Sequence, residues 1–327
     1  MIQNPITRKI TPDPYVCYDA ASGYYYGTCS LQEPNGRTLG EDAVLKVFRA
    51  KRAQDVFDGE SITIRREGDG AYGDYTNVWA PELFHDADGY WYLITSGFHE
   101  KGLVWSSLRI FVLRSRTQNP FDGFDFLREF DEMTHAFDPT LYRAADGRLY
   151  LAYTQVMYPF GCKHYEQRLY IREMHSPGEP SEKFAELSRA ERPFELSHPD
   201  ERINEGPFFL SHEGKLFLIY SANGCGNTDY CLVALEHTGG ALCDARSWQK
   251  ASAPLLYKSE KLLGPGHASF FTAPNGRDVW CAFHAFLHEV APGEYPDRFA
   301  CLCKVDFDEN GRPVIGAARE REPSAPQ

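Results

Sequence analysis

The feature that most constrains the fold of this chain is a unit that occurs five times along it. Each copy contains a short apolar strand, a turn that ends in glycine and a second strand rich in aromatic residues. The first strands begin at Asp13-Pro14-Tyr15-Val16, Ala80-Pro81-Glu82-Leu83, Asp138-Pro139-Thr140-Leu141, Glu205-Gly206-Pro207-Phe208 and His267-Ala268-Ser269-Phe270. The corresponding turn glycines are Gly23, Gly89, Gly147, Gly214 and Gly276. Asp-Gly and Asn-Gly pairs favour the positive φ of tight turns, so each copy predicts a β-hairpin.

The spacing of the copies predicts how they assemble. Successive turn glycines are about 63 residues apart, which is enough for a sheet of four strands with its loops. The sequence contains no amphipathic helical pattern of three or more turns, so the chain is predicted to be all-β. Closing five such units into a ring protects the sheet edges, whereas a series of unrelated β-sandwiches would not produce a recurring unit. We therefore expect a five-bladed β-propeller, with residues 1–327 forming a single catalytic domain.

The residue that opens each repeat is predicted to lie at one mouth of the central channel, because the innermost strands of a propeller run side by side around its axis. Units one, three, four and five have Asp13, Asp138, Glu205 and His267 there, and unit two has the segment Trp79–Glu82. A single Asp before proline is usually a turn residue. Three acids at matching positions are different. Like charges held close together lower the stability of the fold, so such a cluster is expected where function retains it. This mouth is therefore the candidate functional site.

The charge balance and the start of the chain narrow the classes of partner. The chain has 34 Lys and Arg against 46 Asp and Glu, a net charge of -12, and no long basic run. Nucleic acids and anionic membranes are therefore not expected as partners. Residues 1–5 lead into polar residues rather than a signal-peptide core, and no stretch approaches the ~20 apolar residues of a membrane helix, which together predict a cytoplasmic location. The nine cysteines include no CxxC pair, so neither a disulfide framework nor a zinc site is indicated.

Five motifs follow one another along the chain. They are Thr11-Pro12-Asp13-Pro14, Trp79-Ala80-Pro81-Glu82, Phe137-Asp138-Pro139-Thr140, Asn204-Glu205-Gly206-Pro207 and Gly264-Pro265-Gly266-His267. Together they resemble the motif series of glycoside hydrolase family 43. The resemblance spans nearly the whole chain and departs at Ala268, where relatives often have Asn. It implies a five-bladed β-propeller that hydrolyses glycosidic bonds in arabinose- or xylose-containing glycans.

The resemblance also implies a role for each of the three acids. Asp13 would be the general base, Glu205 the general acid, and Asp138 the residue that raises the pKa of the acid and holds it in place. Hydrolysis with inversion needs an acid at the leaving oxygen and a base for water at the opposite sugar face, roughly 6.5–9.5 Å away. A negative charge near Glu205 raises its pKa in the direction that a general acid requires. The alternative for Asp138 is a structural hydrogen-bond acceptor.

Three further residues are expected to bind the substrate. Trp79 would offer an aromatic face to the sugar, with an ordinary inter-blade core residue as its alternative. His267 would lie beneath the sugar; the matching His of relatives can hold calcium or water, and its alternative is a buried imidazole. Arg298 resembles a family arginine that reaches the substrate and the carboxylates, with a surface salt bridge as its alternative. No cofactor is required, although this interpretation leaves room for a structural calcium ion on the axis, with His267 as a ligand.

The favoured activity is that of an exo-acting α-L-arabinofuranosidase on arabinose-containing oligosaccharides, because Asn204–Pro207, Asp229–Leu232 and Gly264–His267 resemble the arabinofuranosidase branches. A β-D-xylosidase with the same acids is the nearest alternative. An endo-arabinanase needs an open groove, whereas the long segments 97–107 and 155–167 could close one side of the mouth. A non-catalytic glycan-binding propeller is disfavoured by the presence of all three acids. The oligomeric state is left open.

Overall fold

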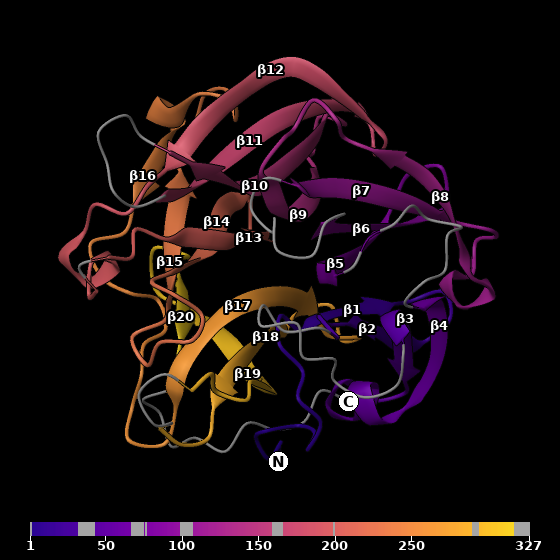
Figure 1. Cartoon of the computed structure of the whole chain (residues 1–327), viewed down its shortest axis with the longest axis horizontal. Helices are drawn as coiled ribbons and strands as arrows, with labels where there is room; N and C mark the ends of the chain where they lie inside the picture. Colours follow the sequence, from indigo (N-terminus) through magenta and orange to yellow (C-terminus); the bar gives the residue numbers. More distant parts are fainter. Residues whose placement is uncertain are drawn as a thin grey trace.

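The computed structural model describes residues 2–31, 43–66, 75, 77–98, 107–158, 166–198, 200–289 and 294–316. In this part of the chain, five antiparallel sheets of four strands each stand around a common axis (Figure 1). The prediction of an all-β, five-bladed propeller is therefore confirmed. Most of the two segments that were expected to close one side of the mouth, residues 99–106 and 159–165, lies outside the described residues.

Each blade consists of four consecutive strands that lie in the sheet in chain order. The first blade contains β1 (Tyr15–Asp19), β2 (Tyr24–Thr28), β3 (Ala43–Ala50) and β4 (Glu60–Arg66). The second contains β5 (Asn77–His85), β6 (Trp91–Phe98), β7 (Leu108–Ser115) and β8 (Phe124–Glu129). The third contains β9 (Ala136–Arg143), β10 (Leu149–Met157), β11 (Glu166–Ser176) and β12 (Glu179–Ser188). The fourth contains β13 (Asn204–His212), β14 (Lys215–Ala222), β15 (Cys231–His237) and β16 (Trp248–Lys250). The fifth contains β17 (Leu263–Thr272), β18 (Val279–Phe286), β19 (Phe299–Phe307) and β20 (Pro313–Ile315).

Short 3-10 helices supplement the strands in the described ranges. They are η1 (Ala53–Asp58), η3 (Pro120–Asp122), η4 (Pro193–Glu195) and η5 (Ala245–Ser247). None of the helices described is long and apolar enough to span a membrane.

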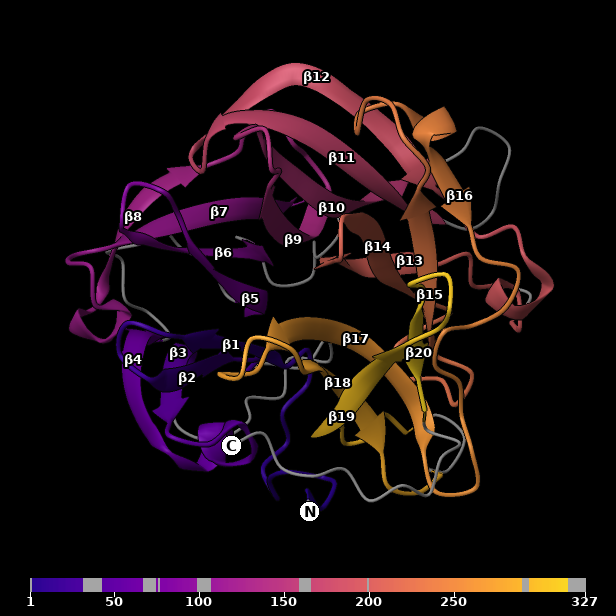
Figure 2. The same cartoon turned by 180° about the vertical axis from the view of Figure 1, so that it is seen from behind.

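The first two strands of every blade form the predicted hairpin. The turn glycines Gly23, Gly89, Gly147, Gly214 and Gly276 all have φ between +66° and +85°. This left-handed conformation is accessible to glycine because it has no Cβ. Strands β1, β5, β9, β13 and β17 line the axis, and each contacts the first strands of the two neighbouring blades (Figures 1 and 2). Residues at the start of these strands therefore meet at the same end of the axis.

The core lies between neighbouring blades. Apolar side chains of two sheets interdigitate at each interface, so the central strands are buried on both faces; all eight residues of β6 and of β18 are buried. Strands buried on both faces are mainly apolar along their length rather than alternating between apolar and polar residues. At the junction of the first and fifth blades, Tyr25 packs edge-on against Phe271, in a cluster that also contains Trp280.

The segment 2–11 joins the last blade to the first. Its backbone pairs with β19, with Ile6 N donating to Ala300 O at 2.9 Å and Thr11 N to Arg298 O at 2.8 Å. The Asn4 side chain donates to the carbonyl of Leu302 and accepts from its N–H. Segment 2–11 then continues directly into the first blade, so it ties together the two blades that close the ring.

Candidate active site

The start of each innermost strand has the same unusual backbone conformation. Asp13, Ala80, Asp138, Gly206 and His267 have φ between +45° and +56°. In blades two to five the ladder between the first two strands is interrupted at this position, as in a β-bulge. A left-handed φ is strained for residues other than glycine, and such residues cluster at functional sites as well as in tight turns. The fold therefore repeats one left-handed position five times around the axis, and four of the five residues there are not glycine.

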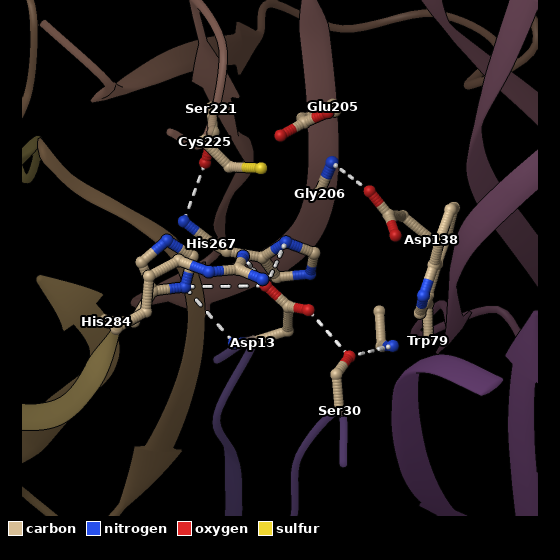
Figure 3. A network of polar contacts seen from close by, with 12 residues as sticks. Asp13, Ser30, Trp79, Asp138, Glu205, Gly206, Ser221, Cys225, His267 and His284 are labelled. Carbon is tan, nitrogen blue, oxygen red and sulfur yellow. Dashed lines mark hydrogen bonds and ion pairs between the residues drawn. The ribbon is translucent and has the colours of Figure 1, made fainter. Parts of the chain in front are cut away.

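This conformation corrects the sequence alignment of the repeats in the fourth blade. The position equivalent to Asp13 and Asp138 is Gly206, with φ +56°, and not Glu205. Glu205 lies one residue earlier on β13, and it is also buried, with 6% of its surface exposed. Because the bulge rotates the chain at Gly206, Glu205 reaches the mouth from a different backbone position than the other two acids. Figure 3 shows Asp13, Asp138 and Glu205 converging from three different blades.

A side chain from the preceding blade accepts a hydrogen bond from most of these strained residues. The acceptors lie within two residues of the end of the second strand. The pairs are His284 Nδ1 with Asp13 N (3.1 Å), Ser30 Oγ with Ala80 N (2.8 Å), Ser96 Oγ with Asp138 N (3.4 Å) and Ser221 Oγ with His267 N (2.7 Å). In the fourth blade the donor Gly206 N is bound by Asp138 Oδ2 instead, at 3.1 Å. These contacts fasten each blade to the next at the level of the site.

Asp13 is surrounded by cationic and polar groups. Its Oδ1 lies 3.0 Å from the guanidinium of Arg298 and 3.2 Å from Nδ1 of His267, and its Oδ2 accepts a 2.6 Å hydrogen bond from Ser30. Burial alone would raise the pKa of Asp13, but the charge of Arg298, followed by interactions with the His267 and His284 side chains, lowers it well below its ordinary value. Asp13 is therefore a carboxylate at neutral pH.

His284 supports Asp13 in a neutral form. Its side chain is fully buried, and burial lowers its pKa to about 3. Because Nδ1 accepts the amide proton of Asp13, the imidazole proton resides on Nε2. His284 therefore acts on the backbone of Asp13, while Arg298 supplies the positive charge.

Asp138 and Glu205 have the opposite electrostatic environment. Burial, and then the negative charges of Glu205 and Asp13, raise the pKa of Asp138 well above its ordinary value. Burial raises the pKa of Glu205 to about 8, although a 2.9 Å hydrogen bond from Tyr230 to Oε1 partly opposes this shift. The N–H of Gly206 favours negative charge on Asp138. The pair therefore retains a proton at pH values where Asp13 has none.

The other predicted residues also lie at this mouth. Arg298 is 2% exposed, so it is a buried partner of Asp13 and not a surface salt bridge. Trp79 directly precedes the strained Ala80, is 7% exposed and packs edge-on against Phe98 with ring centroids 5.2 Å apart. Figure 3 shows Trp79 beside Asp138. Burial lowers the pKa of His267, which makes its imidazole neutral at pH 7.

The residues around His267 do not fit calcium. Calcium takes six to eight oxygen ligands. The carboxylate oxygen closest to the His267 ring, Oδ1 of Asp13, already lies 3.0 Å from the positively charged Arg298. Among the residues that the structure describes, no group of three or more His, Cys, Asp and Glu side chains is placed to hold a metal ion.

Sequence reasoning missed Ser30, His284 and the hydrogen bond from Tyr230 to Glu205. A signal for the first of these exists, because Ser30, Ser96 and Ser221 each lie seven residues after a turn glycine. His284 lies eight residues after its turn glycine, Gly276, so its equivalence to these serines is hidden by the one-residue difference in spacing.

Comparison with known proteins identifies several relatives. The chain is 30% identical over 324 residues to an extracellular exo-α-(1→5)-L-arabinofuranosidase of Streptomyces avermitilis, a match that covers 96% of this chain and 63% of that protein. A protein of the same name from Streptomyces chartreusis is 28% identical over 300 residues, which cover 89% of this chain and 84% of that protein. The crystal structure of an α-L-arabinofuranosidase from Lactobacillus brevis superposes with a TM-score of 0.80 at 26% identity, covering 96% of this chain and 95% of that one.

These relatives overturn the expectation of a cytoplasmic location. Both Streptomyces proteins are named extracellular enzymes, which points to secretion. The expectation rested on the polar residues after the start of the chain, and this signal is weak because a secretory signal peptide is removed from the mature protein.

The family model for glycosyl hydrolases family 43 matches residues 2–313, which include every site residue named above and every strand of the five blades except the end of β20. The sequence motifs, the five-bladed propeller and this match agree. The chain belongs to glycosyl hydrolase family 43.

Proposed function

We propose that this protein is an exo-acting α-L-arabinofuranosidase that removes terminal arabinose from oligosaccharides with inversion, and that residues 1–327 act as one catalytic unit. The names of the two Streptomyces relatives support the sugar and the exo mode of action. The observation that carries the chemistry is the contrast between an ionised Asp13 and an acid pair, Asp138 and Glu205, that retains a proton at the same mouth of the propeller.

In this proposal Asp13 is the general base. It is ionised at neutral pH and accepts a proton from the water that attacks the anomeric carbon. Arg298, His267 and Ser30 fix the orientation of its two oxygens. The pKa of Asp13, which Arg298 lowers most, keeps the carboxylate ionised over a wide pH range.

Glu205 is the general acid in the same proposal. With its pKa raised to about 8, it is protonated at pH 7 and can transfer its proton to the glycosidic oxygen. The electron pair of the breaking carbon–oxygen bond stays with that oxygen, while water forms the new bond at the opposite face. Asp13 and Glu205 come from the first and fourth blades, which are not neighbours in the ring, and this supports an arrangement on opposite sides of the sugar.

Asp138 is proposed to modulate and orient the acid. Its bond to Gly206 N holds the peptide that follows Glu205. The charge of Glu205 raises the pKa of Asp138, and an ionised Asp138 has the same effect on the pKa of Glu205, because the two carboxyl groups repel each other when both are charged. Trp79, His267 and Arg298 are proposed to contact the sugar. No cofactor takes part in the proposed reaction.

The test compares two substrates whose leaving groups depend to different degrees on protonation by the general acid. α-1,5-Arabinobiose has a poor leaving group, whereas 4-nitrophenyl α-L-arabinofuranoside releases 4-nitrophenolate with little protonation. Glu205→Gln should slow hydrolysis of arabinobiose by about 10²–10⁴-fold and affect the nitrophenyl substrate much less. Asp13→Asn should slow both substrates to a similar extent, because each requires an activated water.

Other outcomes would overturn the proposal. Wild-type activity of Glu205→Gln on arabinobiose would refute the catalytic assignment. Hydrolysis of 4-nitrophenyl β-D-xyloside in preference to the arabinofuranoside would identify a β-xylosidase, and release of internal fragments from linear arabinan would identify an endo-acting enzyme. Retention of the anomeric configuration, seen by NMR in the first product, would contradict the roles given to Asp13 and Glu205.

A further inference from the structure

We propose that Tyr230 is a positioning residue for Glu205, and that its ring, stacked on His284, links the general acid to the peptide of the general base. This inference rests on the proposed function and concerns a residue to which no role has so far been given. It is carried by a hydrogen bond, a ring stack and a glycine that makes room for both.

The hydroxyl of Tyr230 binds one oxygen of Glu205 directly. It donates a 2.9 Å hydrogen bond to Oε1, and the whole Tyr230 side chain is buried. Tyr230 immediately precedes β15, and its backbone N–H is bound to the carbonyl of Asn227 at 3.0 Å. Because Oε1 accepts the tyrosine proton, the proton of the neutral acid resides on Oε2, the oxygen that remains for the substrate.

The ring of Tyr230 is held in place from both sides. It lies parallel to the imidazole of His284, with ring centroids 5.4 Å apart and an interplanar angle of 4°. On another side is Gly266, where a Cβ would come within 2.1 Å of the tyrosine ring. The Gly264–His267 motif thus contains a glycine whose missing side chain provides the space that Tyr230 occupies.

These contacts form a continuous path between the two proposed catalytic groups. Glu205 is bonded to Tyr230, Tyr230 stacks on His284, and His284 Nδ1 accepts the N–H of Asp13. Packed rings resist compression, so this path fixes how far the acid and the base can approach each other. The spacing of these two carboxylates is what allows water to enter beside the sugar.

The hydrogen bond also has an electrostatic consequence. It stabilises the carboxylate that Glu205 becomes after proton transfer, and it therefore lowers the pKa of Glu205. Among the residues that the structure describes, the charged or titratable groups that act on or lie against Glu205 include Asp13, Asp138, Glu201, Cys225, Tyr230 and Arg298. Removing the tyrosine hydroxyl leaves the others in place, so its effect on the pH dependence has a defined sign.

The test uses Tyr230→Phe. The alkaline limb of kcat/KM reports deprotonation of Glu205, and it should move to higher pH because a group that lowers this pKa is lost. At neutral pH kcat on arabinobiose should fall by about 10–100-fold, as expected for losing a hydrogen bond to a charged group, with little change in KM. The loss should be smaller on 4-nitrophenyl α-L-arabinofuranoside. The pH midpoint of this limb and the substrate ratio, which is kcat on arabinobiose divided by kcat on the nitrophenyl substrate, do not depend on the fraction of folded enzyme.

A matched control is Tyr92→Phe. Tyr92 is also buried and donates a 2.8 Å hydrogen bond to a carboxylate, Asp88, but in a hairpin turn away from the site. It should leave the alkaline limb and the substrate ratio unchanged. Gly266→Ala, which displaces the Tyr230 ring, should reproduce the altered substrate ratio of Tyr230→Phe.

The inference is wrong if Tyr230→Phe has the wild-type pH profile and substrate ratio, or if it loses activity only in proportion to its stability, as the Tyr92 variant would. Its failure can be distinguished from failure of the proposed function by Glu205→Gln. If that variant loses arabinobiose hydrolysis while Tyr230→Phe behaves as wild type, only the role of Tyr230 is refuted.

Discussion

Replacing Arg298 with methionine should destabilise the protein through Asp13. The two side chains are 2% and 9% exposed and 3.0 Å apart, so the ion pair is shielded from water. Methionine fills a similar volume but leaves the carboxylate without its main cationic partner. Breaking a buried pair in this way costs about 3–5 kcal/mol of the free energy of unfolding. The pKa of Asp13 should rise at the same time, because Arg298 is the largest of the groups that lower it.

The pH dependence has a definite sign. A carboxyl group with a lowered pKa in the folded protein stabilises the fold above its unfolded pKa of about 3.9, and this contribution is lost as the pH falls through the lower folded value. In the Arg298 variant, protonation of Asp13 relieves the buried charge at a higher pH than in wild type. The difference in stability between the two proteins should therefore narrow from about pH 7 to about pH 4.

The assay is a double-mutant cycle measured by urea unfolding. Asp13→Asn, Arg298→Met and the combined variant are compared with wild type, with tryptophan fluorescence as the signal. The combined variant should be at least about 2 kcal/mol more stable than the sum of the single changes predicts, because the two groups are in contact. Additivity within about 0.5 kcal/mol, or a stability difference that does not change with pH, would refute the pairing.

Two further predictions concern buried polar contacts. Lys250→Met should reduce the free energy of unfolding by about 3 kcal/mol, because the ammonium lies 3.0 Å from the fully buried carboxylate of Glu195. Equal urea midpoints for this variant and wild type would contradict the prediction. Ser30→Ala should reduce the free energy of unfolding by about 1–2 kcal/mol and also reduce kcat, because the hydroxyl both donates to Asp13 and accepts from Ala80 N. An unchanged kcat with reduced stability would show that Ser30 serves the fold alone.

The fold could be predicted because its determinants are local. The turn glycines and the aromatic strands that follow them recur at a regular interval, and hairpins of this kind are specified by the few residues of each turn. The convergence of Asp13, Asp138 and Glu205 followed from the closure of such units into a ring. None of these steps required knowledge of side-chain packing.

The details of the site could not be predicted in the same way. Glu205 was aligned by its chemical type, whereas the backbone aligns Gly206 with Asp13; the proline that follows both Asp13 and Gly206 was the better guide. His284 lies in the apolar strand β18, where a lone histidine is usually a core residue. Its contact with Asp13 spans 271 positions of sequence and depends on the packing of two blades, which local patterns do not report.

The segment 2–11 has a consequence for how the reaction can be impaired. It is clamped on β19 and leads within two residues to Asp13, at the point where the chain crosses from the last blade to the first. The groups that hold Asp13 from the other side, His267, His284 and Arg298, all belong to the last blade or the loop before β19. The proposed base therefore lies at the junction between the last blade and the first, where the ring closes. A tag, a truncation or a substitution that detaches segment 2–11 from β19 would therefore disable the proposed catalysis. It would do so without removing any carboxylate and without disturbing the other four blade interfaces.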